Sequence, residues 1–125
     1  MKITLNPNAK DAATRDALVA EGGFGKYYTD HMVICEWSEK DGWGEPHLMP
    51  YGPISLDPAT AVFHYGQEIF EGMKAYRQPD GSIALFRPTA NAKRFANSAR
   101  RLALPEMPVE LFMETVEALV KQDAG

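Results

Sequence analysis

Cysteine is nearly missing from this sequence of 125 residues, which contains only Cys35. One cysteine excludes a disulfide bond within the chain and is typical of a reducing compartment, so we expect a cytoplasmic location. Cys35 follows Ile34 in a strand-like run. We therefore interpret it as a small buried apolar side chain rather than as a nucleophile.

Long apolar runs and an excess of positive charge are also missing. The longest apolar runs cover only a few residues, which excludes a transmembrane helix, and the first residues lack the apolar core of a secretory signal. The net charge of −4 argues against a general nucleic-acid binder. The three histidines, His31, His47 and His64, lack the spacing of metal ligands, so no metal site is predicted.

The remaining pattern predicts an α+β fold, a largely antiparallel sheet with two C-terminal helices packed on it. Hydrophobic residues make up 45% of the chain, enough for a core. Pro46 favours an edge position for its strand. Strands are expected over residues 27–37, 43–49, 54–56, 70–76 and 82–86, and helices over residues 11–20, 87–102 and 108–121, with a further helical turn beginning at residue 57.

Residues 63–77, FHYGQEIFEGMKAYR, form the stretch around which the chain is organised. Aromatic residues and two glycines precede a predicted hairpin that reverses at residues 79–81. Such a loop can line a pocket. From spacing alone, however, the rings of Tyr65, Phe70 and Tyr76 are more simply explained as core residues.

This stretch resembles the small-domain motif of the fold-type IV pyridoxal-phosphate enzymes, and most closely that of the branched-chain amino-acid aminotransferases. The similarity rests on HYG at residues 64–66 and FEGMKAY at residues 70–76. It extends to FG at residues 24–25 ahead of TDHM at residues 29–32, and to residues 86–105. The segment at residues 24–32 disfavours the D-amino acid aminotransferases and aminodeoxychorismate lyases of the same fold type.

The resemblance implies roles for four residues. Arg94 corresponds to the arginine that binds the cofactor phosphate, a role that suits a bidentate donor. Phe24 and Phe70 correspond to rings that line the substrate pocket, and Tyr65 to a tyrosine that reaches the neighbouring subunit's pocket across a dimer interface. Apolar rings suit branched side chains, which bind mainly by burial of apolar surface.

Other polar residues in the matched motifs are expected to be structural. We expect His31 and His64 to form hydrogen bonds rather than to catalyse. Glu71 invites interpretation as a base, but a carboxylate that stabilises a turn is the simpler reading. No catalytic triad can be argued from residue order.

The resemblance also implies what this chain does not contain. The lysine that forms a Schiff base with pyridoxal phosphate lies, in this family, in a larger C-terminal domain, and no lysine here stands in a matching context. The last helix still carries its apolar stripe at Val120. We therefore expect residues 1–125 to form a single N-terminal small domain that contributes no catalytic residue and is inactive alone.

The predicted function is that of a homodimeric branched-chain aminotransferase that moves an amino group between leucine, isoleucine or valine and 2-oxoglutarate, with pyridoxal 5′-phosphate as cofactor and no nucleic-acid or membrane partner. In this reading the domain belongs to branched-chain amino-acid biosynthesis, and the isolated chain does not bind the cofactor. Two alternatives remain open: a non-catalytic module that associates with itself through an exposed apolar face, or another fold-type IV enzyme.

Overall fold

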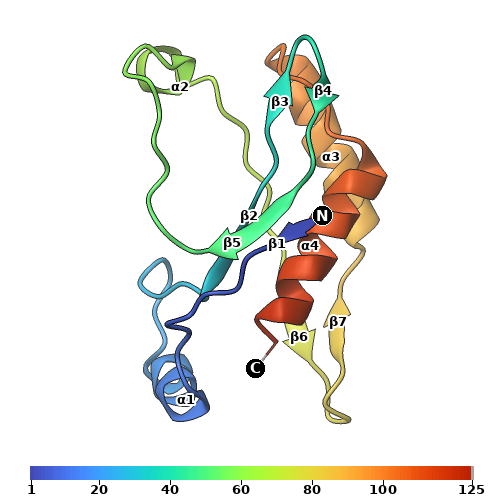
Figure 1. The fold of residues 1–125 in the computed structure, drawn as a ribbon. Helices are drawn as coiled ribbons and strands as arrows, with labels where there is room; N and C mark the ends of the chain where they lie inside the picture. Colours follow the sequence, from blue (N-terminus) through green and yellow to red (C-terminus); the bar gives the residue numbers. More distant parts are fainter. Residues whose placement is uncertain (125) are drawn as a thin grey trace. The chain divides into compact units, whose positions relative to one another are not determined.

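The computed structural model describes residues 1–124, which group into two compact units. The first unit consists of residues 1–53 and 118–124, and the second of residues 54–117. Figure 1 shows the elements: β1 Lys2–Ile3, α1 Ala12–Glu21, β2 His31–Ile34, β3 Trp37–Ser38, β4 Gly42–Trp43, β5 His47–Pro50, α2 Ala61–Tyr65, β6 Ala75–Arg77, β7 Ile83–Leu85, α3 Pro88–Arg101 and α4 Val109–Gln122.

A three-stranded sheet in the order β1-β5-β2 forms the centre of the first unit. Strands β2 and β5 are antiparallel, with Val33 opposite Leu48, and the side chain of Leu48 is buried. The predicted pairing of these two segments is therefore confirmed, although each strand is shorter than expected. Strand β1, which runs parallel to β5, was not predicted, because two residues carry no periodicity that sequence can show.

The expected edge position of the strand at Pro46 is wrong, since β5 lies between β1 and β2. Pro46 immediately precedes β5 and contributes only its carbonyl, which accepts a hydrogen bond from the Lys2 N–H at 2.8 Å. The missing N–H of proline therefore costs the sheet no hydrogen bond at this position.

The predicted helix at residues 11–20 is confirmed as α1. Its N-cap is Asp11, whose side chain accepts a hydrogen bond from the Thr14 N–H at 2.8 Å. The helix ends at Gly22, which has a φ of 68° and donates its N–H to the Leu18 carbonyl. Only glycine adopts that backbone conformation at little cost, so the end of α1 is set by this residue.

Helix α3 and the first residues of α4 provide the core of the second unit. Ala92 and Ala99 are buried on α3, Phe112 is buried on α4, and the rings of Phe95 and Phe112 lie 5.3 Å apart. The amphipathic pattern of both helices is thus confirmed, and so is the α+β class with short, mainly antiparallel sheets and two C-terminal helices.

Three details of the second unit differ from expectation. Residues 54–56 form no strand. The helix expected to begin at Asp57 begins at Ala61, because Asp57 caps a turn instead and accepts a hydrogen bond from the Ala59 N–H at 2.7 Å. The hairpin strand expected from residue 70 begins only at Ala75, since Glu71 and Gly72 are bonded to side chains of α3 rather than to a neighbouring strand.

Within residues 1–124, none of the helices combines the length and the apolar character needed to cross a membrane. Cys35 is half-buried, and its thiol donates a hydrogen bond to the Gly44 carbonyl at 3.4 Å. The expected burial of this cysteine is therefore only partial.

Candidate functional site

Arg94 and Glu71 form an ion pair in the second unit that is held by two hydrogen bonds. Arg94 donates from Nε to Glu71 Oε1 and from Nη2 to Glu71 Oε2, the latter at 2.9 Å. The side chain of Glu71 is 6% exposed, whereas that of Arg94 is 68% exposed. The carboxylate is therefore a buried anchor, and the guanidinium is the group that reaches solvent.

Asn91 adds a second contact to the same carboxylate. It lies three residues before Arg94, so both side chains leave the same face of α3. Its Nδ2 donates to Glu71 Oε2 at 2.7 Å and to the Gly72 carbonyl at 3.1 Å. One turn of α3 thus fixes the position of the loop at residues 70–72.

These contacts change the acidity of Glu71. The hydrogen bond from Arg94 is the largest cause that lowers its pKa, from 4.5 to about 2, with Asn91 and the charge of Arg94 adding to the effect. Burial acts in the opposite direction, because it penalises the charged form. A carboxylate with so low a pKa is a weak base, and both of its oxygens are already bonded to Arg94 or Asn91, which supports a structural role.

The donors of Arg94 suit a phosphate group. A guanidinium has five N–H donors, and Glu71 engages Nε and one donor of Nη2. The Nη1 side belongs to the opposite edge of the planar group. Because Arg94 is largely exposed, these donors can reach an anion, so the residues present fit the phosphate of a cofactor.

Phe70 and Tyr65 lie in the same unit as Arg94, and both side chains are largely exposed, at 85% and 86%. Phe70 directly precedes Glu71 in the loop that α3 holds. Its ring packs on Gly72, where an added Cβ would lie only 3.2 Å from Phe70 Cζ. The interpretation of these rings as core residues is therefore wrong, and they remain available to a ligand.

Phe24 belongs to the first unit, in the loop between α1 and β2, and its side chain is fully exposed. Tyr65 ends α2, and Gly66 follows it in the left-handed conformation with a φ of 59°. The structure thus brings Tyr65, Phe70 and Arg94 into one unit. The substrate-binding role of Phe24 stays a prediction.

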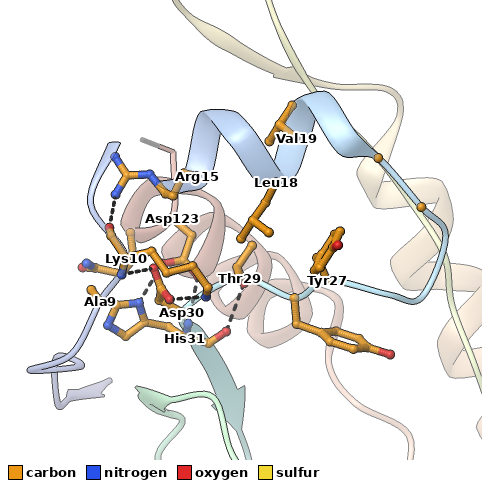
Figure 2. A pocket seen from close by; sticks show the side chains of 14 residues that line it. Ala9, Lys10, Arg15, Leu18, Val19, Tyr27, Thr29, Asp30, His31 and Asp123 are labelled. Carbon is orange, nitrogen blue, oxygen red and sulfur yellow. Dashed lines mark hydrogen bonds and ion pairs between the residues drawn. The ribbon is translucent and has the colours of Figure 1, made fainter. Parts of the chain in front are cut away.

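A cavity of about 500 Å³ opens in the first unit beside α1 (Figure 2). Leu18, Val19 and Tyr27 line its apolar part, and Lys10 and Asp30 are among its polar residues. None of the four predicted site residues lines this cavity. It is therefore a feature separate from the predicted cofactor contact.

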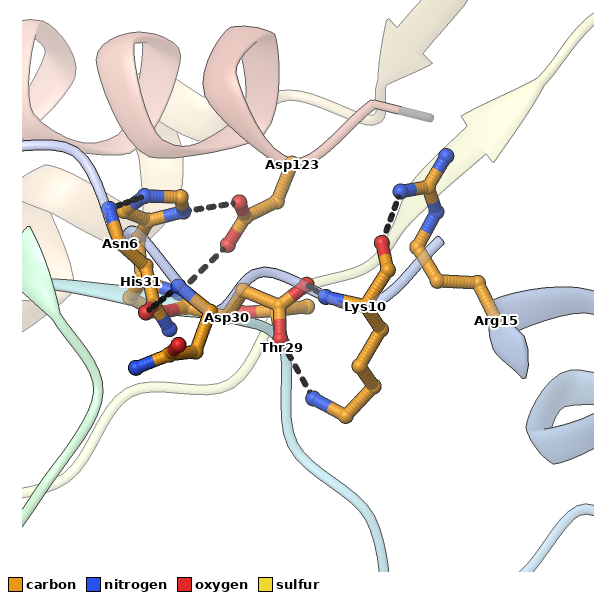
Figure 3. Close-up of polar contacts among 8 residues, drawn as sticks. Asn6, Lys10, Arg15, Thr29, Asp30, His31 and Asp123 are labelled. Atoms are coloured by element: carbon orange, nitrogen blue, oxygen red, sulfur yellow. Dashed lines mark hydrogen bonds and ion pairs between the residues drawn. The ribbon is translucent and has the colours of Figure 1, made fainter. Parts of the chain in front are cut away.

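A hydrogen-bonded cluster around His31 borders this cavity (Figure 3). His31 Nδ1 lies 2.6 Å from Asp123 Oδ1, and the His31 N–H donates to Asp123 Oδ2 at 3.1 Å. The Asn6 N–H donates to His31 Nε2 at 2.9 Å. Because Nε2 accepts, the ring proton lies on Nδ1 and is donated to Asp123. His31 therefore joins the N-terminal segment, β2 and the end of the chain.

An ion pair next to His31 holds the adjoining segments. Lys10 contacts Asp30 through both its backbone N–H and its ammonium group. The hydrogen bond from the Lys10 side chain is the main cause that lowers the pKa of Asp30. Arg15 donates to the Lys10 carbonyl at 2.7 Å, which ties α1 to the same cluster.

The prediction that the motif histidines form structural hydrogen bonds is confirmed. His31 is 4% exposed within the cluster just described. His64 Nε2 bonds to the Pro58 carbonyl at 2.6 Å and so braces the turn ahead of α2.

Sequence reasoning missed two partners. Glu71 and Arg94 are 23 residues apart, and His31 and Asp123 are 92 residues apart. Neither separation produces a period that a single sequence can show. A usable signal for Glu71 was its place directly after Phe70 in the loop motif, because a carboxylate that is buried has to be paired.

No family model matches the chain, but individual relatives do. It is 55% identical, over 97% of its length, to the probable branched-chain-amino-acid aminotransferase of Streptomyces coelicolor. It is 54% identical, again over 97% of its length, to the branched-chain-amino-acid aminotransferase of Mycolicibacterium smegmatis. The mitochondrial branched-chain-amino-acid aminotransferase of Saccharomyces cerevisiae is 46% identical over 98% of the chain.

These similarities make the chain a homologue of aminotransferases. More narrowly, it matches the N-terminal part of proteins named branched-chain-amino-acid aminotransferases, which confirms the predicted resemblance. The chain spans about a third of the length of these relatives, 34%, 33% and 30% in the three cases.

The ion pair of Glu71 predicts a pH-dependent stability. A carboxylate whose pKa is lowered on folding stabilises the fold above its unfolded value, here 4.5, and loses that contribution as the pH falls through about 2. After allowance for screening by water around Arg94, we expect Glu71→Gln to cost about 1–2 kcal/mol at pH 7. Urea unfolding from pH 2 to pH 7 measures this.

The difference between the wild type and Glu71→Gln is expected to shrink below pH 4.5. Glu106→Gln is the matched control, because Glu106 forms a similar two-point pair with Arg100 of the same helix but is more exposed. A cost for Glu71→Gln that is equal at pH 3 and pH 7 would contradict the assignment.

Proposed function

We propose that this chain is the N-terminal domain of a longer pyridoxal-phosphate-dependent branched-chain amino-acid aminotransferase. The relatives support this proposal by their names and by the share of their length that the chain spans. The full protein would act on leucine, isoleucine or valine with 2-oxoglutarate, as a cytoplasmic homodimer in branched-chain amino-acid biosynthesis.

The observation that carries the proposal is the exposure and hydrogen bonding of the Arg94 guanidinium. Its guanidinium is exposed, is held by a buried carboxylate, and keeps donors for an anion. In the proposed enzyme, Arg94 binds the cofactor phosphate and so fixes one end of the cofactor. Bound pyridoxal phosphate would supply the electron-withdrawing ring that the chemistry requires.

The exposed rings complete the contribution of the chain. Phe70 and Phe24 would bury the branched side chain of the substrate and exclude water from it, and Tyr65 would reach the pocket of the neighbouring subunit in the proposed homodimer. Apolar walls of this kind favour substrates whose side chains bury apolar surface, which leucine, isoleucine and valine do.

An activity assay with leucine and 2-oxoglutarate tests the proposal. We expect the full-length protein that carries this sequence to turn over in the presence of pyridoxal phosphate, and the 125-residue chain to show no turnover, since it contributes no lysine in the required context. The product glutamate is measured in a coupled assay. Valine and isoleucine should replace leucine, and aspartate should not.

Two results would contradict the proposal. Cofactor-dependent turnover by the 125-residue chain would show that the reactive lysine lies within it. A folded full-length protein that is inactive toward all three branched-chain amino acids would favour the other readings, a different fold-type IV enzyme or a non-catalytic module.

A further inference from the structure

Arg94 is an exposed arginine whose side-chain orientation is fixed by a buried carboxylate. Its partner Glu71 is 6% exposed and is itself held by Asn91, while Arg94 is 68% exposed. An exposed arginine without a partner samples many rotamers, and these have to be ordered when a ligand binds. The buried carboxylate orders them in advance.

We propose that Glu71 is a positioning residue for the phosphate of the cofactor. It binds the Nε and Nη2 side of Arg94 and leaves the Nη1 side for the phosphate. This inference rests on the proposed function of Arg94, and it adds a role for Glu71, which the proposed function does not include. Asn91 belongs to the same device, because it holds the carboxylate oxygen that also accepts from Nη2.

Glu71 could affect phosphate binding in two opposite ways. Its negative charge reduces the attraction of Arg94 for an anion, whereas its two hydrogen bonds fix the guanidinium. The phosphate-facing side of Arg94 is in contact with water, which screens the charge effect. Fixing the side chain is not screened, so we expect positioning to dominate.

The test compares two probes, pyridoxal 5′-phosphate and pyridoxal, in the apo form of the full-length protein that carries this sequence. Glu71→Gln is expected to weaken pyridoxal 5′-phosphate binding by about threefold to tenfold, the range for ordering one long side chain on binding. Binding of pyridoxal, which lacks the phosphate, is expected to stay unchanged. Both dissociation constants are measured by absorbance titration.

The selective loss separates positioning from a general structural role. Damage to the fold would weaken both probes alike, whereas loss of positioning changes only the ratio of the two dissociation constants. Glu106→Gln is the control, since it removes the carboxylate of the Arg100 pair on the same helix. It should leave the ratio at the wild-type value.

A second variant keeps the test decisive if Glu71→Gln does not fold. Asn91→Ala removes the hydrogen bond that steadies Glu71 but leaves the ion pair, so a smaller shift of the ratio in the same direction is expected. An unchanged ratio in the folded variants, or tighter binding of pyridoxal 5′-phosphate, would overturn the inference while the proposed function stands. A wild type that binds both probes equally would instead contradict the proposed phosphate contact of Arg94.

Discussion

Replacing Arg94 by alanine is expected to weaken binding of pyridoxal 5′-phosphate to the full-length protein by about a hundredfold. Hydrogen bonds to charged groups contribute about 1.5–3 kcal/mol each, and the variant removes both the donors and the charge. It also leaves the buried carboxylate of Glu71 without its cation, so part of the loss will be structural. The dissociation constant is measured by absorbance titration, and the free energy of unfolding is measured alongside it.

Arg94→Lys is expected to recover only part of the affinity. Lysine keeps the positive charge but cannot bind Glu71 and a phosphate with two planar edges. Arg100→Ala provides the matched control, because it removes an arginine of the same helix that is similarly exposed and that pairs with Glu106. If Arg94→Ala and Arg100→Ala weakened binding equally, Arg94 would have no special role.

Replacing His31 by alanine is expected to destabilise the first unit by about 2–4 kcal/mol. The substitution removes the ring contacts to Asp123 and to the Asn6 N–H, and it leaves a backbone N–H and a carboxylate short of a partner in a part-buried place. The chain segments that His31 connects are far apart in sequence, so the loss of these contacts is expected to destabilise the whole unit. Urea unfolding at pH 7 measures the change.

His64→Ala is the appropriate comparison for His31→Ala. His64 also forms a hydrogen bond within the protein, to the Pro58 carbonyl, but its side chain is exposed. Its loss should cost less than 1 kcal/mol, because water replaces an exposed hydrogen bond. Equal costs for the two variants would mean that the cluster around His31 does not hold the unit together.

The helices were predictable from the sequence because their signals are local. The apolar spacing on residues 87–102 and the carboxylate of Asp11 ahead of residues 12–20 each act within a few residues. The hairpin at β6 and β7 was predictable for the same reason, since residues 79–81 contain proline and glycine. Its first strand was predicted too long because Gly72 bonds to α3, a contact that lies outside any local window.

The candidate site was only partly predictable. Arg94 was identified from its motif, and its exposure agrees with a ligand-binding role, but the burial of Glu71 beneath it depends on the packing of a loop on α3. The exposure of Phe70 and Tyr65 also escaped reasoning from composition, since aromatic residues usually belong to a core. A sequence motif can indicate the residues of a site, whereas tertiary packing determines which of their side chains are buried and which are exposed.

The close fit of Phe70 against Gly72 has a consequence for any attempt to alter substrate choice. In the proposed enzyme, residues 70–72 would supply a ring of the substrate pocket, the carboxylate that anchors Arg94 and the glycine that makes room for the ring, so one short piece of backbone would serve all three purposes. A bulkier residue at position 72 would displace the ring and pull on the arginine at the same time. Engineers who wish to change selectivity without loosening the cofactor would do better to begin at Tyr65, which ends a different element.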